Sequence, residues 1–513
     1  MRFLLWVLFI AGSAFAGPTT PPGGPTCPAW MSETSSFPVC PASGGLLDET
    51  FPVVATVISD LESTRTPGAA RAMAWATMWQ VLTAAGDRTP LMLLPVTDET
   101  FQFLQEQISH EARTTEEKTR WLASLRKVDA QSYRWQQDYF AAVATPQGAV
   151  QLRHSDSYHS LPTQAFNSLL RAAGDCGIVR GPPLRARQGN VDGSAGGNLL
   201  TLPGGICLAG DDHFASNRDY TTFFSQLCDT RKMIHVPTHW LNVGHSDEIV
   251  KVIRVPTRAS PCDFAVEVAS PDKALELMRA DANGSFVPST ITDNQLQSEM
   301  LLRLCFLGER LQGPSVPRPV APVGGQSQWI WDFGLTRASA MVLDNEQLPP
   351  LDPEILRRCR TLKNGTVARA IEGDSDFRIF NRLVQKKMTQ LKSDIQSALK
   401  KQFPQCAPDV FDVPQLFYGD GVLDIMNPRP GGPTQDLPGR AGLSVLPNPT
   451  NAMLVGSTLI TPEPYNEAFK HYLSDEVGRR GLTATYVDSF DAAHLQGGNL
   501  HCATHEIRKC RPR

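Results

Sequence analysis

The chain carries eleven cysteines behind an amino-terminal export signal, and this combination restricts how it can fold. Residues 1–16 have a basic start, an apolar stretch over residues 3–10 and a small-x-small segment over residues 14–16, which is typical of a signal peptide. The predicted location is therefore secreted or periplasmic, where disulfides persist. Because eleven is an odd number, at least one thiol must stay outside the disulfides, and one thiol with five disulfides satisfies the count.

Overall composition limits the classes of partner. The chain has 513 residues, a net charge of −4 and a pI near 6.3, so its charge favours neither a nucleic-acid surface nor a membrane surface. The leader is too short to span a bilayer as a helix, and no later apolar stretch is long enough. We therefore predict an exported protein with neither nucleic acid nor membrane as a partner.

The pattern of apolar residues favours alternating strands and helices. Residues 51–58 and 91–96 have the pattern of buried strands, residues 68–85 and 98–128 that of helices, and residues 384–403 that of a basic amphipathic helix with a solvated outer face. Before them, residues 17–47 are rich in Pro, Gly, Ser and Thr. These residues are expected to form an extended arm, closed by a local disulfide between its two cysteines.

The carboxyl-terminal part contains the clearest module. Residues 452–461 are predicted as a strand, a helix begins at Pro464 and stops at Gly481, and residues 482–489 form the next strand. Residues 201–241 repeat this order, with a helix around 217–228, but without obvious sequence identity. The predicted fold class is therefore α/β.

Cys502 lies in a glycine-rich stretch, Gly497–Gly498–Asn499–Leu500–His501–Cys502. Paired glycines allow the backbone to press close to a bound ligand, and a cysteine placed there is a nucleophile when nearby groups stabilise its thiolate. The alternative is that Cys502 is a disulfide partner, for example of Cys510. This stretch by itself favours neither interpretation.

Polar side chains elsewhere suit one kind of substrate. Asp138 follows Trp135 in one cluster, and His245 and Asp247 would face the same side of an extended segment. Two carboxylates can pair with the N–H groups of a planar guanidinium, and an aromatic ring can stack on its face. A thiolate can attack its central carbon while a histidine protonates the ammonia that leaves. The histidines at 235, 239 and 245 match no standard zinc spacing, so we expect no metal there.

These segments resemble the catalytic domain of the protein-arginine deiminases. Six collinear motifs carry the resemblance, and a seventh, Val179–Arg180–Gly181–Pro182, resembles the family's substrate-arginine region. The six are Trp135–Gln136–Gln137–Asp138, Gly197–Asn198–Leu199, Trp240–Leu241–Asn242–Val243–Gly244–His245–Ser246–Asp247–Glu248, Asp412–Val413–Pro414–Gln415–Leu416–Phe417, Leu446–Pro447–Asn448–Pro449–Thr450–Asn451–Ala452–Met453 and His501–Cys502–Ala503–Thr504.

The resemblance implies a role for each of six residues. Cys502 matches the nucleophile, His245 the general acid and base, and Asp138 and Asp247 the carboxylates that bind the guanidinium. For the substrate, Trp135 matches the aromatic residue beside the arginine side chain, and Arg180 the arginine that holds the substrate backbone.

The resemblance also implies a fold and a reaction. The family fold is a five-bladed, pseudo-symmetric α/β propeller of ββαβ modules, which agrees with the module near the carboxyl terminus and would span residues 48–513. The implied reaction converts peptidyl-arginine, in a peptide or protein partner, to peptidyl-citrulline and ammonia through a cysteine thiouronium intermediate.

Calcium is a cofactor of some family members, but most of its ligand positions are lost here. Those members bind it partly through acidic residues that follow Trp-x-Gln-Asp and Gly-Asn-Leu. This chain has residues 139–141, Tyr-Phe-Ala, in the first place and Leu200 in the second, and only Gln137 of that set remains. We therefore expect a calcium-independent enzyme without a cofactor.

Two other functions stay open. Gly-Gly-Asn-Leu-His-Cys also resembles the deiminases of free guanidino compounds, so agmatine or arginine is an alternative substrate. A catalytically dead secreted propeller used for binding is the alternative from another class. It would be favoured by a disulfide between Cys502 and Cys510.

Overall fold

The computed structural model describes most of the chain between residues 27 and 512. Outside the described residues lie 1–26, 60–66, 129–139, 154–162, 181–195, 211–226, 288–290, 292–356, 420–441, 495–497, 513 and a few shorter gaps. The signal peptide, Trp135, Asp138 and the helix expected around 217–228 therefore fall outside them.

The described residues form a mixed α/β fold in which five sheets share one pattern. In each, an antiparallel pair of strands is extended by a strand parallel to its second member. The hydrogen-bonded orders are β1-β5-β6-β7, β10-β9-β8, β11-β12-β13, β16-β17-β18 and β19-β2-β3-β4, and β14-β15 forms a further pair. None of the sheets that these residues form closes on itself, so a complete ring of five blades is not established.

The strands are short. Their bounds are β1 Gly45–Leu46, β2 Val53–Ile58, β3 Leu91–Leu94, β4 Leu125–Lys127, β5 Phe140–Thr145, β6 Gly148–Arg153, β7 Val179–Arg180, β8 Leu199–Leu202, β9 Ile206–Gly210, β10 Met233–Val236, β11 Val250–Arg254, β12 Phe264–Ser270, β13 Val410–Pro414, β14 Phe417–Gly419, β15 Gly442–Ser444, β16 Met453–Val455, β17 Thr458–Pro462, β18 Thr483–Val487 and β19 Thr504–Arg508.

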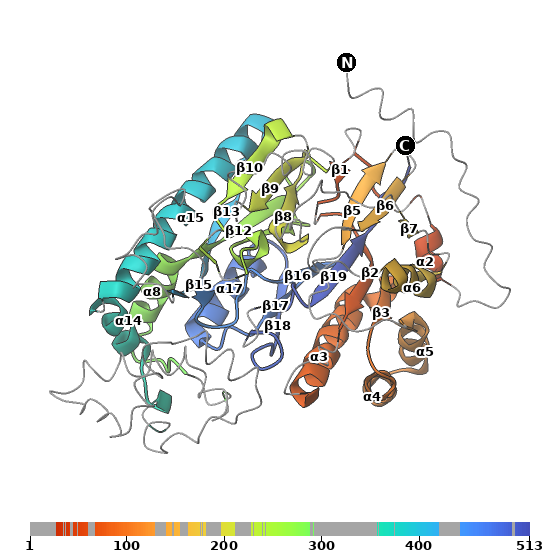
Figure 1. Ribbon diagram of the computed structural model, residues 1–513, viewed down its shortest axis with the longest axis horizontal. Coiled ribbons are helices and arrows are strands. Elements are labelled where there is room, and N and C mark those ends of the chain that lie inside the picture. Colours follow the sequence, from red (N-terminus) through yellow and green to blue (C-terminus); the bar gives the residue numbers. More distant parts are fainter. Residues whose placement is uncertain are drawn as a thin grey trace.

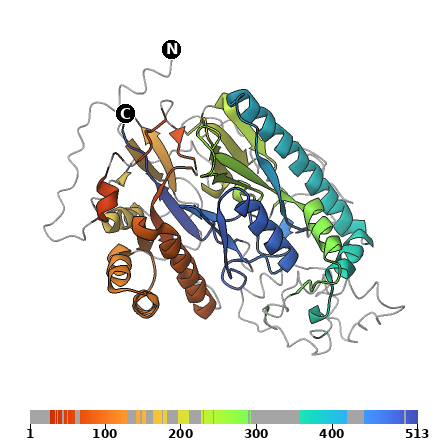
Figure 2. The ribbon, with the colours of Figure 1, turned by 180° about the vertical axis from the view of Figure 1, so that it is seen from behind.

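Helices cover the sheets from outside (Figures 1 and 2). The long helix α15 packs on the sheets of β10 and β12, and α3 packs on β2 and on the sheet of β17. The helices are α2 Ala29–Ser32, α3 Pro67–Ala85, α4 Asp98–Glu111, α5 Thr115–Ser124, α6 Thr163–Ala173, α8 Pro271–Ala280, α14 Asn364–Gly373, α15 Ser375–Gln402 and α17 Glu467–Gly478. None of the helices among the described residues is long and apolar enough to cross a membrane.

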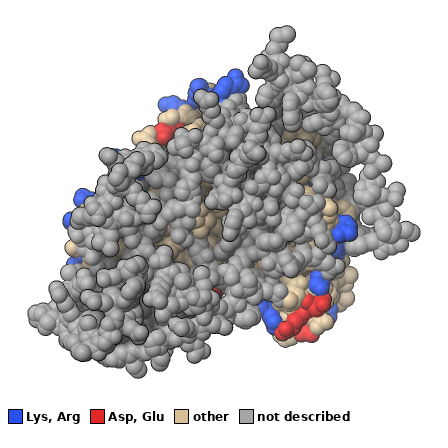
Figure 3. All heavy atoms as spheres, in the orientation of Figure 1, with Lys and Arg blue, Asp and Glu red and all other residues tan. Residues whose placement is uncertain are grey.

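Several sequence predictions are confirmed. The strands at 51–58 and 91–96 appear as β2 and β3, and the helix at 68–85 appears as α3. The apolar face predicted for residues 384–403 is the buried face of α15, because its five predicted members are at most 2% exposed. They are Val384, Met388, Leu391, Ile395 and Leu399. Figure 3 shows basic residues along the edge formed by this helix and acidic residues around α4, as expected for solvated outer faces.

Two predicted elements are wrong in detail. The helix expected over residues 98–128 is broken into α4, α5 and strand β4. The backbone becomes extended at Ala112, directly after α4, and Thr114 caps α5 by accepting a hydrogen bond from the Glu117 amide. The strand expected over 452–461 is a hairpin of β16 and β17, in which Gly456 turns with a φ of +61°.

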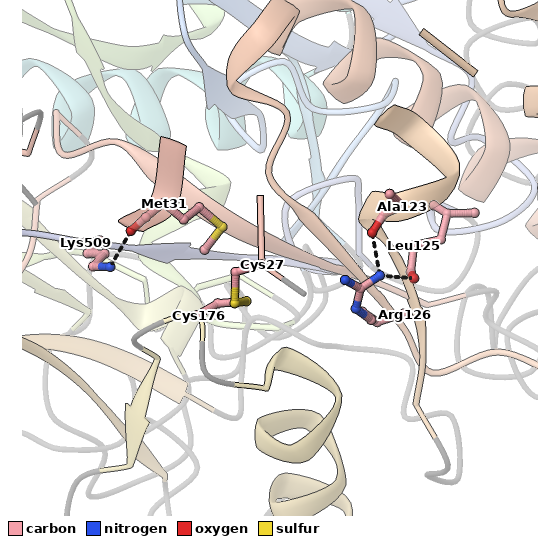
Figure 4. Close-up of a disulfide and its surroundings, with 7 residues drawn as sticks. All are labelled: Cys27, Met31, Ala123, Leu125, Arg126, Cys176 and Lys509. Atoms are coloured by element: carbon pink, nitrogen blue, oxygen red, sulfur yellow. Dashed lines mark hydrogen bonds between the residues drawn. A yellow bond between two sulfur atoms is a disulfide. The ribbon is translucent and has the colours of Figure 1, made fainter. Parts of the chain in front are cut away.

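The disulfides differ from the local arm disulfide that the sequence suggested. The arm cysteines do not pair with each other: Cys27 bonds to Cys176 and Cys40 bonds to Cys510. Met31 and Phe37 of the arm are also buried against β2. Figure 4 shows the first disulfide beside the hydrogen bond from Lys509 Nζ to the Met31 carbonyl, at 3.1 Å. The arm is therefore anchored to the domain.

Two further disulfides join Cys207 to Cys228 and Cys262 to Cys406, and Cys359 is disulfide-bonded as well. Cys502 is the cysteine among the described residues that keeps its thiol. The disulfide with Cys510 that would have favoured a dead binding protein is thus excluded, because Cys510 bonds to Cys40. This number of disulfides is consistent with an extracellular location.

The last strand closes the chain onto its amino-terminal half. β19 pairs antiparallel with β2, from Thr504 opposite Ile58 to Arg508 opposite Val53. Directly after it, the Cys40 amide donates a hydrogen bond of 3.0 Å to the Arg511 carbonyl, beside the disulfide to Cys510. Because Cys502 lies two residues before β19, this closure fixes the stretch that the sequence singled out.

We expect the disulfide between the chain ends to contribute more stability than a local one. Cys40 and Cys510 are 470 residues apart, whereas Cys207 and Cys228 are 21 apart, and a longer closed loop loses more unfolded-state entropy. Changing both cysteines to alanine should lower the free energy of unfolding by about 6 kcal/mol for the first pair and about 3 kcal/mol for the second. Urea denaturation of both double variants measures this; a larger loss for the local pair would contradict it.

Candidate functional site

Cys502 lies in a tight buried turn that leads into β19. The Ala503 amide donates to the Asn499 carbonyl at 3.2 Å and the Thr504 hydroxyl donates to the Leu500 carbonyl at 3.0 Å. These bonds hold the turn, and Cys502 itself is 4% exposed. A thiol in such a place reacts only with a ligand that enters the protein.

Asn451 makes three hydrogen bonds to the Cys502 turn. Its Nδ2 donates to Cys502 Sγ at 3.2 Å, its Oδ1 accepts from the Cys502 amide at 3.2 Å, and its carbonyl accepts from the His501 amide at 3.1 Å. A donor directed at sulfur favours the thiolate over the thiol. The sequence placed Asn451 in a family motif but assigned it no role, since nothing in the spacing shows that residues 451 and 502 meet.

Asp247 lies beside the same thiol. It is fully buried in the 3-10 turn η7 (Ser246–Glu248), which leads into β11. Its Oδ2 lies 3.8 Å from Cys502 Sγ and 2.7 Å from His501 Nδ1. Its Oδ1 has no hydrogen-bond partner in the described part of the chain, so this oxygen can accept a bond from a ligand.

His245 caps the turn that holds Asp247. Gly244, with a φ of +84°, lets the chain turn before it, and Glu248 Oε1 accepts a hydrogen bond of 2.9 Å from the His245 amide. The prediction that His245 and Asp247 face one space is retained, but the extended geometry on which it was based is wrong. They are brought together by a capped turn and not by strand alternation.

Gly197 forms the wall of the space that His245 and Asp247 share. A Cβ on Gly197 would lie 2.8 Å from His245 Nδ1 and 3.1 and 3.2 Å from the two carboxylate oxygens of Asp247. Its neighbour Asn198 holds the opposite turn, because the Ser246 hydroxyl donates to the Asn198 carbonyl at 3.1 Å. The absence of a side chain at Gly197 therefore keeps open a cradle between an imidazole and a carboxylate.

The structure thus brings together three of the six residues that the sequence proposed for the site. Cys502 and Asp247 are in direct contact, and His245 and Asp247 share the space at Gly197. Asp138 and Trp135 lie outside the described residues. The backbone of Arg180 is in β7, paired with Gln151 of β6. Asn451, Gly197 and His501 are the residues that the sequence reasoning missed.

His501 joins Asp247 to a buried group of charged side chains. Its Nδ1 lies 2.7 Å from Asp247 Oδ2 and its Nε2 lies 3.3 Å from Glu506 Oε2. Burial lowers the pKa of His501 and the charge of Lys251 lowers it further, but Glu506 and Asp247 outweigh both and raise it to about 9. His501 is therefore an imidazolium at neutral pH. The charge on His501 in turn helps to hold the pKa of Glu506 well below its usual range, against the effect of burial.

The described residues do not fit a calcium ion where the family would place one. Leu200, at the position after Gly-Asn-Leu, is 4% exposed and packs in the core around β8 and β11. An apolar side chain offers no oxygen, which calcium requires. No group of three His, Cys, Asp or Glu side chains that could hold a metal is found within the described ranges.

Comparison with known proteins supports the resemblance. A family model described as protein-arginine deiminase (PAD) matches residues 344–512. Protein-arginine deiminase type-4 of Mus musculus is 28% identical over 119 residues, which is 22% of this chain and 16% of that protein. The resemblance inferred from the motifs is thereby confirmed. The match covers Asn451 and Cys502, whereas His245 and Asp247 lie before it.

Solved structures overlap broadly at low similarity. An agmatine deiminase of C. jejuni gives a TM-score of 0.45 at 10% identity and covers 91% of this chain and 97% of its own. A structure provisionally named a peptidyl-arginine deiminase gives 0.44 at 12% identity, with 91% and 99% covered.

Filling the cradle should abolish ligand binding without unfolding the protein. We expect Gly197→Ala to reduce turnover of an arginine substrate at least about a hundredfold, because its Cβ would occupy the space between His245 and Asp247. Gly68→Ala is the matched control, since a Cβ there meets nothing within 4 Å. Rates and circular dichroism spectra of both variants test this, and near-normal turnover in Gly197→Ala would refute it.

His501 should make stability depend on pH. Its pKa is raised from an ordinary value of 6.5 to about 9, so its contribution is complete below pH 6.5 and is lost as the pH rises through about 9. Between about pH 6 and pH 10, the free energy of unfolding should fall by about 3 kcal/mol more in wild type than in His501→Gln. Urea denaturation across this range measures the difference. Parallel pH curves for the two proteins would show that His501 does not bind a proton more tightly when folded.

Proposed function

Because residues 344–512 match the protein-arginine deiminases, we propose that this chain is an exported deiminase that converts peptidyl-arginine to peptidyl-citrulline and ammonia. The family indicates hydrolysis of an amidine C–N bond. The observation that carries the proposal is the cradle beside Gly197, where a buried thiol, a carboxylate and an imidazole converge. A guanidinium is planar and cationic and needs carboxylate acceptors for its N–H groups.

The proposed reaction starts with a covalent step. The guanidinium lies with N–H groups donating to Oδ1 of Asp247 and to Asp138, and Trp135 lies beside the side chain. The Cys502 thiolate attacks the guanidinium carbon to form a C–S bond. As the C–N bond breaks, His245 donates a proton and ammonia leaves, so an alkylthiouronium remains on the enzyme.

A second step releases the product. His245, now neutral, takes a proton from a water molecule that attacks the thiouronium carbon. The C–S bond breaks and the Cys502 thiolate is restored, and citrulline leaves after the second proton of the attacking water has passed to solvent. Asn451 supports both steps, since its Nδ2 can donate to the sulfur whenever the thiolate is present.

The choice of peptidyl-arginine over a free guanidino compound rests on sequence. The family match and the mouse relative are protein-arginine deiminases by name, and Arg180 is proposed to bind a backbone carbonyl of the substrate. The alternative, a deiminase of agmatine or arginine, is favoured by the sequence Gly497–Gly498–Asn499–Leu500–His501–Cys502, which resembles that related family. A dead binding propeller is disfavoured, because Cys502 keeps its thiol.

The wider architecture is part of the same proposal. The five sheets with an antiparallel pair and a parallel extension would be the blades of an α/β propeller spanning residues 48–513, with the cradle near its axis. Residues 1–16 would be removed as a signal peptide, and residues 17–47 would remain as an arm held by its disulfides.

Citrulline release tests the function directly. We expect wild type to deiminate an N-acylated arginine amide in the presence of a chelator, and Cys502→Ala to be inactive because it lacks the attacking sulfur. Asn451→Ala should lower kcat about tenfold to a hundredfold, since the thiolate loses a donor. Agmatine and free arginine are the competing substrates. If agmatine is turned over faster than the arginine amide, the substrate is a free guanidino compound and not a peptide. If activity is lost in chelator and recovered when calcium is added, the enzyme is not calcium-independent.

A further inference from the structure

We propose that His501 is a positioning residue which, as an imidazolium, keeps Asp247 ionised and turns its Oδ1 toward the guanidinium. This inference rests on the proposed function. It assigns a role to a side chain that does not itself touch the cradle in the contacts described above.

The geometry requires protons on both ring nitrogens. Nδ1 faces Asp247 Oδ2 at 2.7 Å and Nε2 faces Glu506 Oε2 at 3.3 Å. A neutral imidazole has one N–H group, so its other nitrogen would direct a lone pair at a carboxylate oxygen. Only the imidazolium donates to both carboxylates.

Further charged side chains lie in the same buried region. Lys251 of β11 stands opposite Glu267 of β12 in the strand register, and Arg508 Nη2 lies 3.6 Å from Glu506 Oε1. Because a buried charge is costly unless it is paired, the carboxylates of Asp247 and Glu506 that face His501 favour its protonated form; all three groups are at most 6% exposed.

The two carboxylate oxygens of Asp247 have different roles: Oδ2 binds His501, and Oδ1 is left to bind the ligand. Oδ2 accepts from His501 at 2.7 Å, which fixes the plane of the carboxylate. Oδ1 then has no hydrogen-bond partner within the described residues and lies 3.2 Å from where a Cβ of Gly197 would be. The fixed cation therefore favours an ionised Asp247 whose second oxygen is directed at the ligand.

The first test measures ligand binding without turnover. In a Cys502→Ala background, the Kd of an N-acylated arginine amide is measured from pH 4 to 9 by calorimetry, with and without His501→Gln. We expect binding at pH 7 to weaken about tenfold or more and the acid midpoint of binding to rise by about one pH unit, since a neutral amide stabilises the carboxylate less. His494→Gln is the matched control. It is another buried histidine, 4% exposed, whose ring packs on Phe490, and it should leave both values unchanged.

A second variant separates charge from packing. Glu506→Gln keeps the His501–Asp247 bond but removes one of the two carboxylates that hold the proton, so the Kd should match that of the Cys502→Ala parent at pH 6 and be about tenfold or more weaker than the parent's at pH 8. A merely structural His501 would not produce this alkaline loss. If His501→Gln does not fold, the Glu506→Gln variant tests the proposal by itself.

The outcomes distinguish the two proposals. If wild type deiminates the amide but His501→Gln and Glu506→Gln bind it with parent affinities and pH midpoints, the positioning role is wrong and the proposed function stands. If wild type neither binds nor deiminates any guanidino compound, the proposed function fails and the role of His501 fails with it.

Discussion

The pairing of the last strand, β19, with β2 is the constraint on which the site depends. Cys502 lies two residues before β19 and contacts segments that are about 50 and 250 residues earlier in the chain. The disulfide of Cys510 with Cys40 and the backbone bond between Cys40 and Arg511 close the chain directly behind that strand. Cys502 can therefore be buried in a rigid turn although it lies close to the carboxyl terminus, where chains usually fray.

A second constraint is electrostatic. The protein buries the ion pairs of His501 with Asp247 and Glu506 beside the thiol, and apolar residues can replace buried ion pairs of this kind at little or no cost in stability. Such a cluster is better explained by the orientation and charge that it imposes on Asp247 than by a gain in stability. The glycine at 197 has a similar meaning, because a side chain there would take up the space between His245 and Asp247.

Much of the local structure was predictable from residue pattern. The buried strand β2, the helix α3 and the apolar face of α15 follow from periodicity and burial alone. Errors occurred where a short segment interrupts a pattern, as residues 112–114 do between α4 and α5 and Gly456 does between β16 and β17. Periodicity cannot detect such a break when apolar spacing continues across it.

By itself, the sequence determined which chemical groups are available: a cysteine left over from the disulfide count, the His245–Asp247 pair and the motifs shared with the protein-arginine deiminases. Only the tertiary structure decided which of them meet. The disulfide partners of the arm, the grip of Asn451 on Cys502 and the bridge from His501 to Asp247 and Glu506 all depend on strand pairing between distant segments. Residue pattern reports how each segment folds locally, whereas contacts between segments depend on the packing of the whole chain.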